Sequence, residues 1–152
     1  MTVFLAVVYD TAIVGLRVAH ASDERENVRQ QLAHALDLMT REISMASNVD
    51  AAQDQQLQLD ADVNGDGTTE NDILYQVQNS QLQRTYNGST VTLVRDLASL
   101  DFNYADLNGA DLATPVTGCA LDRLRVMQVT MEATKDAETL SVASAAFLRN
   151  ND

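Results

Sequence analysis

The chain contains very little cysteine, which excludes two kinds of stabilising site. Cys119 is the only cysteine among 152 residues, so no disulfide can form within the chain. A zinc site built on thiolates needs further cysteines that the sequence lacks. Free cysteines belong to the most buried residue types, so we expect Cys119 to be a buried, inert thiol, with a bridge to another molecule as the alternative.

Basic residues are also scarce. The 10 Lys and Arg side chains face 22 Asp and Glu side chains, which gives a formal net charge of −12. Nucleic acids and anionic lipid surfaces are bound through clustered Lys and Arg, so we expect no nucleic-acid partner. The excess of carboxylates suits the binding of cations instead.

Residue patterns typical of catalytic sites are missing. The two histidines, His20 and His34, both fall in the N-terminal segment, and no serine has a Gly-x-Ser-x-Gly or Ser-x-x-Lys setting. The 6 glycines form neither a P-loop nor a dinucleotide-binding pattern. We therefore expect a protein that is not an enzyme.

Proline is absent before Pro115, which permits a helix of unusual length near the N-terminus. From Val3 to about Ser47, apolar side chains recur at helical spacing. These side chains are Val14, Val18, Ala21, Val28, Leu32, Leu36, Met39, Ile43 and Ala46. A continuous helix here would be about 65–70 Å long, more than a domain of a hundred-odd residues can cover. We expect residues 1–27 to protrude as an assembly segment and residues 28–152 to form the globular domain.

A charged stretch, residues 22–29, separates the two halves of this helix. A polar segment between two apolar ones is typical of a passage between environments, and a merely solvated helical face is the alternative. The apolar stripe is broad over residues 28–46, so this half is predicted to lie on a sheet. The other faces of this half are predicted to carry Arg29, Gln30, Asp37, Arg41 and Glu42.

After Asn48 the sequence changes to the alternation of β-strands. Strands are predicted at residues 56–60, 73–78, 82–86, 90–94, 100–104, 124–131 and 139–148. Tight turns are predicted at residues 79–80 and at Asn87-Gly88, and a surface loop at residues 106–118. The fold class is therefore α+β, with a long N-terminal α-helix packed across an antiparallel β-sheet.

One loop has the residue spacing of a metal site. Asp62, Asn64 and Asp66 place oxygen ligands at alternate positions, and Gly67 allows a sharp bend, as in the first half of an EF-hand or dockerin-type calcium loop. Thr68 would then offer its backbone carbonyl. Oxygen ligands without nearby His or Cys favour Ca²⁺ over zinc.

The second half of that loop departs from the EF-hand pattern. Its twelfth position is Ile73, which cannot coordinate an ion, so Asp72 or Glu70 would have to close the site. The predicted ligands are Asp62, Asn64, Asp66, Thr68 and Asp72. The alternative is a loop held by Asx turns, without an ion.

Several stretches in a fixed order resemble the type IV pilin and pseudopilin superfamily, and among its branches the minor pilins and minor pseudopilins most. They are residues 38–46, 73–84, 93–104, 124–129 and 147–150. The resemblance implies a non-enzymatic structural subunit that inserts its N-terminal helix among like subunits of a type IV pilus, a type II secretion-like filament or a tip complex. It also implies a place in the bacterial cell envelope: in the inner membrane and periplasm, or in a pilus on the cell surface.

The signature that opens the helix of this family, a basic leader, a glycine and a Phe-Thr-Leu-Ile-Glu-like start, is not present here. Residues 3–9 resemble the later part of that helix and are too short to span a bilayer. We therefore expect the beginning of a longer hydrophobic segment to be missing from this chain. The complete helix would lie in the inner membrane before assembly.

The N-terminal half of the helix is the predicted assembly surface. Its side chains are Val3, Phe4, Leu5, Val7, Val8, Ile13 and Val14. The competing hypothesis is a calcium-dependent extracellular binding or adhesion module on a helical stalk. In that hypothesis the Asp62 loop and the loop of residues 106–118 face a ligand.

Overall fold

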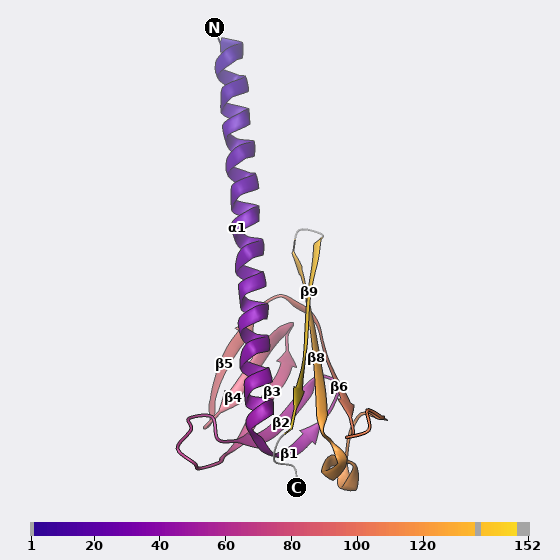
Figure 1. Cartoon of the computed structure of the whole chain (residues 1–152). Coiled ribbons are helices and arrows are strands. Elements are labelled where there is room, and N and C mark those ends of the chain that lie inside the picture. The colour runs from indigo at the N-terminus through magenta and orange to yellow at the C-terminus, as the bar shows by residue number, and fades with distance from the viewer. Residues whose placement is uncertain (1, 136–137, 149–152) are drawn as a thin grey trace.

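A computed structural model of the chain describes residues 2–135 and 138–148, with the side chains from Asp23 onward except that of Asn71. Its dominant element is the helix α1 (Thr2–Met45), whose 44 residues extend over about 66 Å. Figure 1 shows the C-terminal half of α1 against β-strands and the N-terminal half projecting away from them. Within the described part of the chain, no helix is both long and apolar enough to cross a membrane.

The helix ends two residues earlier than predicted, because a strand that the sequence analysis missed begins at once. This strand, β1 (Ala46–Ala52), pairs antiparallel with β2 (Gln56–Ala61). Ser47 donates its hydroxyl to the Asp60 carbonyl at 3.2 Å, and Asn48 donates its amide to the Asp50 carboxylate at 2.8 Å. Short polar side chains of this kind compete with helical hydrogen bonds and favour the extended backbone.

The remaining strands form two antiparallel sheets where the sequence analysis expected one. The first has the order β1-β2-β3-β4-β5 and is completed by β3 (Glu70–Gln78), β4 (Gln81–Tyr86) and β5 (Ser89–Val94). The second has the order β7-β6-β8-β9, with β6 (Leu97–Ala105), β7 (Asp111–Leu112), β8 (Val126–Lys135) and β9 (Glu138–Phe147). A short 3-10 helix, η1 (Gly118–Arg123), precedes β8. The α+β class is confirmed.

Both predicted hairpin turns are confirmed by their backbone angles. Asn79 and Ser80 have φ of 52° and 56°, and Asn87 and Gly88 have φ of 50° and 71°. Two consecutive residues with positive φ match the right-handed twist of the strands that they join. The turns therefore set the register of β3 with β4 and of β4 with β5.

The core lies where α1 meets both sheets. The helix packs against β8 and β9 of one sheet and against β2 and β5 of the other. Among its described side chains, Val28 is the first that is buried, and Leu32, Ala35, Met39 and Ile43 follow on the same face. The sheets add buried side chains that include Tyr75, Leu100, Phe102, Met127, Val129 and Met131.

Two ion pairs join α1 to the β8–β9 hairpin where the helix leaves the domain. Glu24 pairs with Lys135 at 3.1 Å, and Arg25 pairs with Glu138 at 3.2 Å. Figure 1 shows this hairpin rising beside the helix, beyond the other strands. The charged stretch between the two halves of the helix is therefore partly neutralised by the hairpin.

Two expectations about individual side chains were wrong. Glu42, expected on an outer face of the helix, is only 1% exposed. Cys119, expected to be buried, is exposed on η1, a surface turn with no buried residue. The short 3-10 turn is too small to cover its own side chains, so the thiol faces solvent.

Candidate metal site

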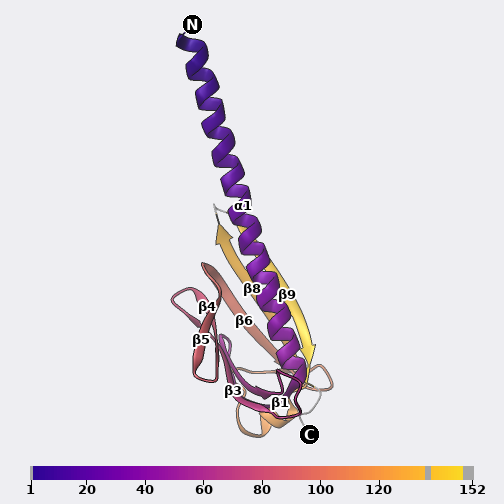
Figure 2. The same ribbon diagram turned by 90° about the vertical axis from the view of Figure 1, so that its left-hand side faces the viewer.

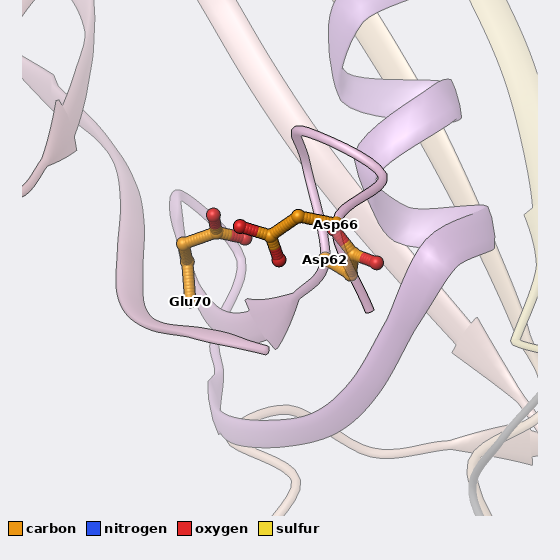
Figure 3. Close-up of side chains that lie close together, drawn as sticks. All are labelled: Asp62, Asp66 and Glu70. Carbon is orange, nitrogen blue, oxygen red and sulfur yellow. The ribbon is translucent and has the colours of Figure 1, made fainter. Parts of the chain in front are cut away.

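The loop between β2 and β3 brings three carboxylates together. Asp62, Asp66 and Glu70 each offer an oxygen, and these oxygens lie within 4.8 Å of one another. Figure 3 shows the three side chains converging across the loop. Asp62 and Glu70 are half-buried and Asp66 is exposed. The cluster can hold a metal ion with oxygen ligands.

The backbone of the loop wraps around these carboxylates. Asp62 accepts hydrogen bonds from the N–H groups of Gly65 at 2.7 Å and Gly67 at 2.8 Å. The two glycines have φ of 77° and 83°, a conformation that side chains with a Cβ rarely adopt. Asp66 accepts the N–H of Thr68 at 2.7 Å. The bend expected at Gly67 is confirmed, and Gly65 adds a second one.

Asn64 links two members of the cluster. Its Nδ2 donates to Asp66 at 3.0 Å and to Glu70 at 2.6 Å, while its Oδ1 accepts the Asp66 N–H at 2.8 Å. The amide nitrogen thus occupies the position between two carboxylates that a cation would prefer. An ion bound there requires the amide to turn so that its oxygen faces the metal.

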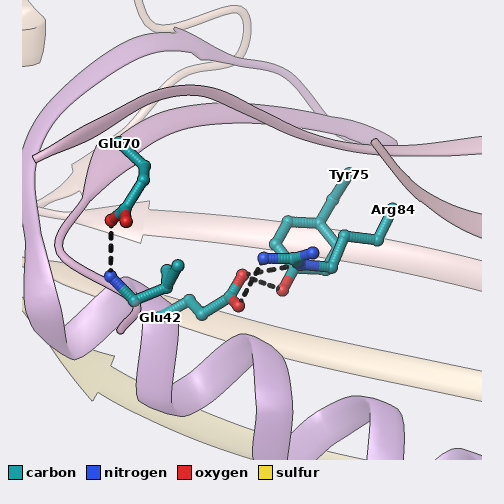
Figure 4. A network of polar contacts seen from close by, with 5 residues as sticks. Glu42, Glu70, Tyr75 and Arg84 are labelled. Carbon is teal, nitrogen blue, oxygen red and sulfur yellow. Dashed lines mark hydrogen bonds and ion pairs between the residues drawn. The ribbon is translucent and has the colours of Figure 1, made fainter. Parts of the chain in front are cut away.

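Glu70, rather than Asp72, closes the loop. The second oxygen of Glu70 accepts the Val63 N–H at 2.9 Å, as Figure 4 shows. Asp72 instead accepts the side-chain amide of Gln58 at 2.7 Å, and its own N–H donates to Asp60 at 2.9 Å. On spacing along the sequence alone, both carboxylates are candidates to close the loop.

The loop also favours an ionised Asp66. The pKa of Asp66 lies below its ordinary value, mainly because the Thr68 N–H, and then the Asn64 amide, donate to the carboxylate. Asp66 therefore carries a negative charge at neutral pH, as a metal ligand must.

The second loop of the binding-module hypothesis is organised around a different carboxylate. Asp106 is 6% exposed and accepts the N–H groups of Asn108 at 2.9 Å and Ala110 at 3.0 Å. Arg123 pairs with its second oxygen at 3.0 Å. The Ala110 N–H and then Arg123 hold the pKa of Asp106 below its ordinary value. Asp106 thus fixes the fold of this loop through both of its oxygens.

A buried polar cluster that the sequence analysis missed joins α1 to the first sheet. Arg84 on β4 donates to both oxygens of Glu42, with its Nε at 3.0 Å and its Nη2 at 2.7 Å. Tyr75 on β3 donates its hydroxyl to Glu42 at 2.5 Å. Figure 4 shows the three side chains meeting above the helix.

This Glu42 cluster is largely out of contact with water. Burial raises the pKa of the Tyr75 hydroxyl, and the neighbouring Glu42 charge raises it further. A feature of the sequence could have located Glu42, because it follows Ala35 by seven residues and Met39 by three and so shares their helical face.

The predicted assembly residues fall on α1, but their side chains lie outside the described part of the structure. They are Val3, Phe4, Leu5, Val7, Val8, Ile13 and Val14. Their role stays a prediction. No protein-family model matches this chain, and no curated protein matches it.

Proposed function

We propose that this chain is a non-enzymatic assembly subunit of the minor pilin or minor pseudopilin kind, acting in a type IV pilus, a type II secretion-like filament or a tip complex. One observation carries the proposal. The helix α1 runs for 44 residues, and its described side chains become buried only from Val28 onward. The N-terminal half of this helix therefore extends beyond the domain that anchors it (Figure 2).

A protruding helix of this kind needs a partner. Residues 2–27 extend over about 39 Å, and isolated helices gain little stability in water without packing. The apolar side chains that we expect to make the assembly contacts in this half are Val3, Phe4, Leu5, Val7, Val8, Ile13 and Val14. Helices of like subunits are the partner that we propose, with the bacterial inner membrane as the location before assembly.

Deletion of residues 1–25 is expected to abolish assembly and to leave a folded domain, because the buried helix residues begin at Val28. The measurement is co-purification and cross-linking with candidate partner subunits encoded by neighbouring genes, with circular dichroism to verify the fold. Arg29→Ala, an exposed change in the retained half of the helix, is the control and should assemble normally. Assembly that persists without residues 1–25 would contradict the proposal.

We further propose that the loop between β2 and β3 binds Ca²⁺ through Asp62, Asn64, Asp66 and Glu70. The convergence of three carboxylate oxygens within 4.8 Å supports it. Hard oxygen ligands suit Ca²⁺, and the two left-handed glycines let the loop close around an ion. In the alternative function, a calcium-dependent adhesion module on a helical stalk, Asp66→Ala would abolish ligand capture and leave assembly intact.

Excess Ca²⁺ is expected to raise the melting temperature relative to excess chelator. At a free concentration 100 times Kd, binding stabilises the folded state by about 2.7 kcal/mol, which corresponds to about 5–10 °C for a domain of this size. The pKa of Asp66 lies below the ordinary pKa of an aspartate, so this carboxylate stays ionised until the pH falls below that ordinary pKa. The calcium-induced rise in melting temperature should therefore persist from pH 7 to about pH 5 and vanish in stronger acid.

Matched variants separate the ligands from their neighbours. Glu70→Gln should remove most of the calcium shift, whereas Asp72→Asn, two residues away and bonded to Gln58 instead, should keep it. An identical melting temperature of the unaltered protein in calcium and in chelator would show that Asx-type hydrogen bonds alone organise the loop.

A further inference from the structure

The outer edge of β9 differs from the other three sheet edges, each of which is blunted. β1 has two register shifts and is bridged at Ala52 by Val116. β7 is 2 residues long, and the β4–β5 pair that ends the first sheet contains a register shift. β9 pairs with β8 over all 10 of its residues without a shift, and it has no proline and no lysine. Long, regular edges of this type are templates for another strand.

The hydrogen-bond pattern identifies which backbone groups of β9 point outward. The Leu148 N–H donates to the Arg125 carbonyl, so even-numbered residues at this end face β8. On β6, the Phe102 N–H donates to the Asp54 carbonyl and therefore points away from β8. Counted from the other side of β8, this gives the same alternation of inward and outward backbone groups along β9. The outward backbone groups therefore belong to Thr139, Ser141, Ala143, Ala145 and Phe147. Within the described part of the chain, these outward N–H and C=O groups form no backbone hydrogen bond.

A groove runs between this edge and the helix. Its lining residues on β9 are Val142, Ala143 and Ser144, and its volume is about 420 Å³. The helix contributes Ala33, Leu36, Asp37 and Thr40. Small side chains on both walls let another backbone approach β9 closely. The edge and the groove together have the form of a site for an extended peptide segment.

The charge of the groove selects the type of partner. Asp37 is its one charged lining residue and is exposed. Within the described part of the chain, the carboxylate of Asp37 forms no ion pair or side-chain hydrogen bond. A second copy of this chain, with a net charge of −12, would bring further negative charge to this edge. A different protein with a basic side chain opposite Asp37 is the complementary occupant.

We propose that β9 receives an extended strand of a different protein, which pairs with its outward backbone groups and places a lysine or arginine opposite Asp37. The partner strand carries small or β-branched side chains that fit the groove. This inference rests on the globular domain alone and does not depend on the proposed role of the N-terminal half of α1. It extends the second sheet by one strand through β-augmentation.

The test uses the full chain and an end-capped synthetic peptide of about ten residues that alternates threonine and valine and carries one central lysine. Binding is expected to slow amide hydrogen exchange at Ser141, Ala143 and Ala145 by about tenfold or more, because their N–H groups become donors in a new ladder. The readout is exchange measured by NMR on isotope-labelled protein. A peptide with glutamate in place of lysine should bind more weakly.

Ala143→Pro should abolish peptide binding, because proline removes an outward N–H and leaves the bonds to β8 in place. Ala143→Ser keeps both the outward N–H and a small side chain in the groove, so it is the matched control, with thermal melting to verify that both variants fold. Unchanged exchange on addition of peptide, or equal binding by Ala143→Pro, would overturn the proposal. So would equal affinity for the glutamate peptide, or a dimer of the chain that Ala143→Pro dissociates in sedimentation.

Discussion

Replacement of Arg84 by leucine is expected to lower the free energy of unfolding by about 3–5 kcal/mol, the range for breaking a buried ion pair at one partner. Arg84 supplies two of the three hydrogen bonds that Glu42 receives from β3 and β4. With leucine in its place, Glu42 would stay buried, at 1% exposure, with Tyr75 as the one remaining donor among these three hydrogen bonds. The loss of stability arises more from leaving the Glu42 carboxylate buried without a cation than from losing the attraction between Glu42 and Arg84.

A double-mutant cycle measured by urea denaturation tests this explanation. Glu42→Leu combined with Arg84→Leu removes both charges, so the double variant should be more stable than Arg84→Leu alone. Arg41→Leu removes an exposed positive charge one position away on the same helix and should change stability by less than about 0.5 kcal/mol. A loss below about 1 kcal/mol for Arg84→Leu would mean that water reaches Glu42 readily.

Leu32→Ala is expected to destabilise the protein by about 2–5 kcal/mol, as large-to-small changes in close-packed cores do. Leu32 is 0% exposed and belongs to the helix face that contacts both sheets. The change removes apolar contacts and leaves a cavity between α1 and the strands. Urea denaturation measures the loss, and the slope with denaturant should stay constant if the fold is retained.

Leu107→Ala is the matched control, because it makes the same chemical change at a solvent-exposed position. Leu107 is 81% exposed on the loop after β6. It should alter stability by less than about 0.5 kcal/mol. Equal losses for the two leucine variants would indicate that α1 is held by its polar contacts and ion pairs rather than by its apolar face.

The elements that were predicted correctly are those whose causes are local. Helical periodicity located the buried side of α1, and the turn residues at Asn79, Ser80, Asn87 and Gly88 located two hairpins. β1 was missed because its sequence, Ala-Ser-Asn-Val-Asp-Ala-Ala, has little alternation and few β-branched residues. Its extended form depends on pairing with β2.

The division into two sheets also depends on contacts between distant residues. Arg95 and Asp96 join β5 to β6 as a two-residue link, which by length alone would predict one more hairpin. The chain instead passes to the second sheet there, and β6 pairs with β8. The Leu97 N–H donates to the Ser80 carbonyl at 2.9 Å, a contact with the β3–β4 turn that the sequence does not reveal.

The metal loop could be predicted only in its first half. Alternate oxygen ligands from Asp62 to Asp66 follow from spacing along one chain segment. The identity of the closing carboxylate follows from where β3 begins, since Glu70 starts the strand and faces the loop while Asp72 bonds to Gln58 on β2. The Glu42 cluster could not be predicted, because it forms only where β3 and β4 approach α1, and local sequence patterns do not show that approach.

The alignment of α1 with the β8–β9 hairpin determines how the molecule would respond to a pull along the helix axis. Figure 2 shows the helix running alongside these two strands. A pull along the helix axis therefore shears the contacts of α1 with β8 and β9 together, rather than peeling them apart one after another. Where the helix leaves the domain, that force acts first on two ion pairs, Glu24 with Lys135 and Arg25 with Glu138. At the other end, Met45 continues into β1 without a loop, so tension reaches the five-stranded sheet with no slack in the chain.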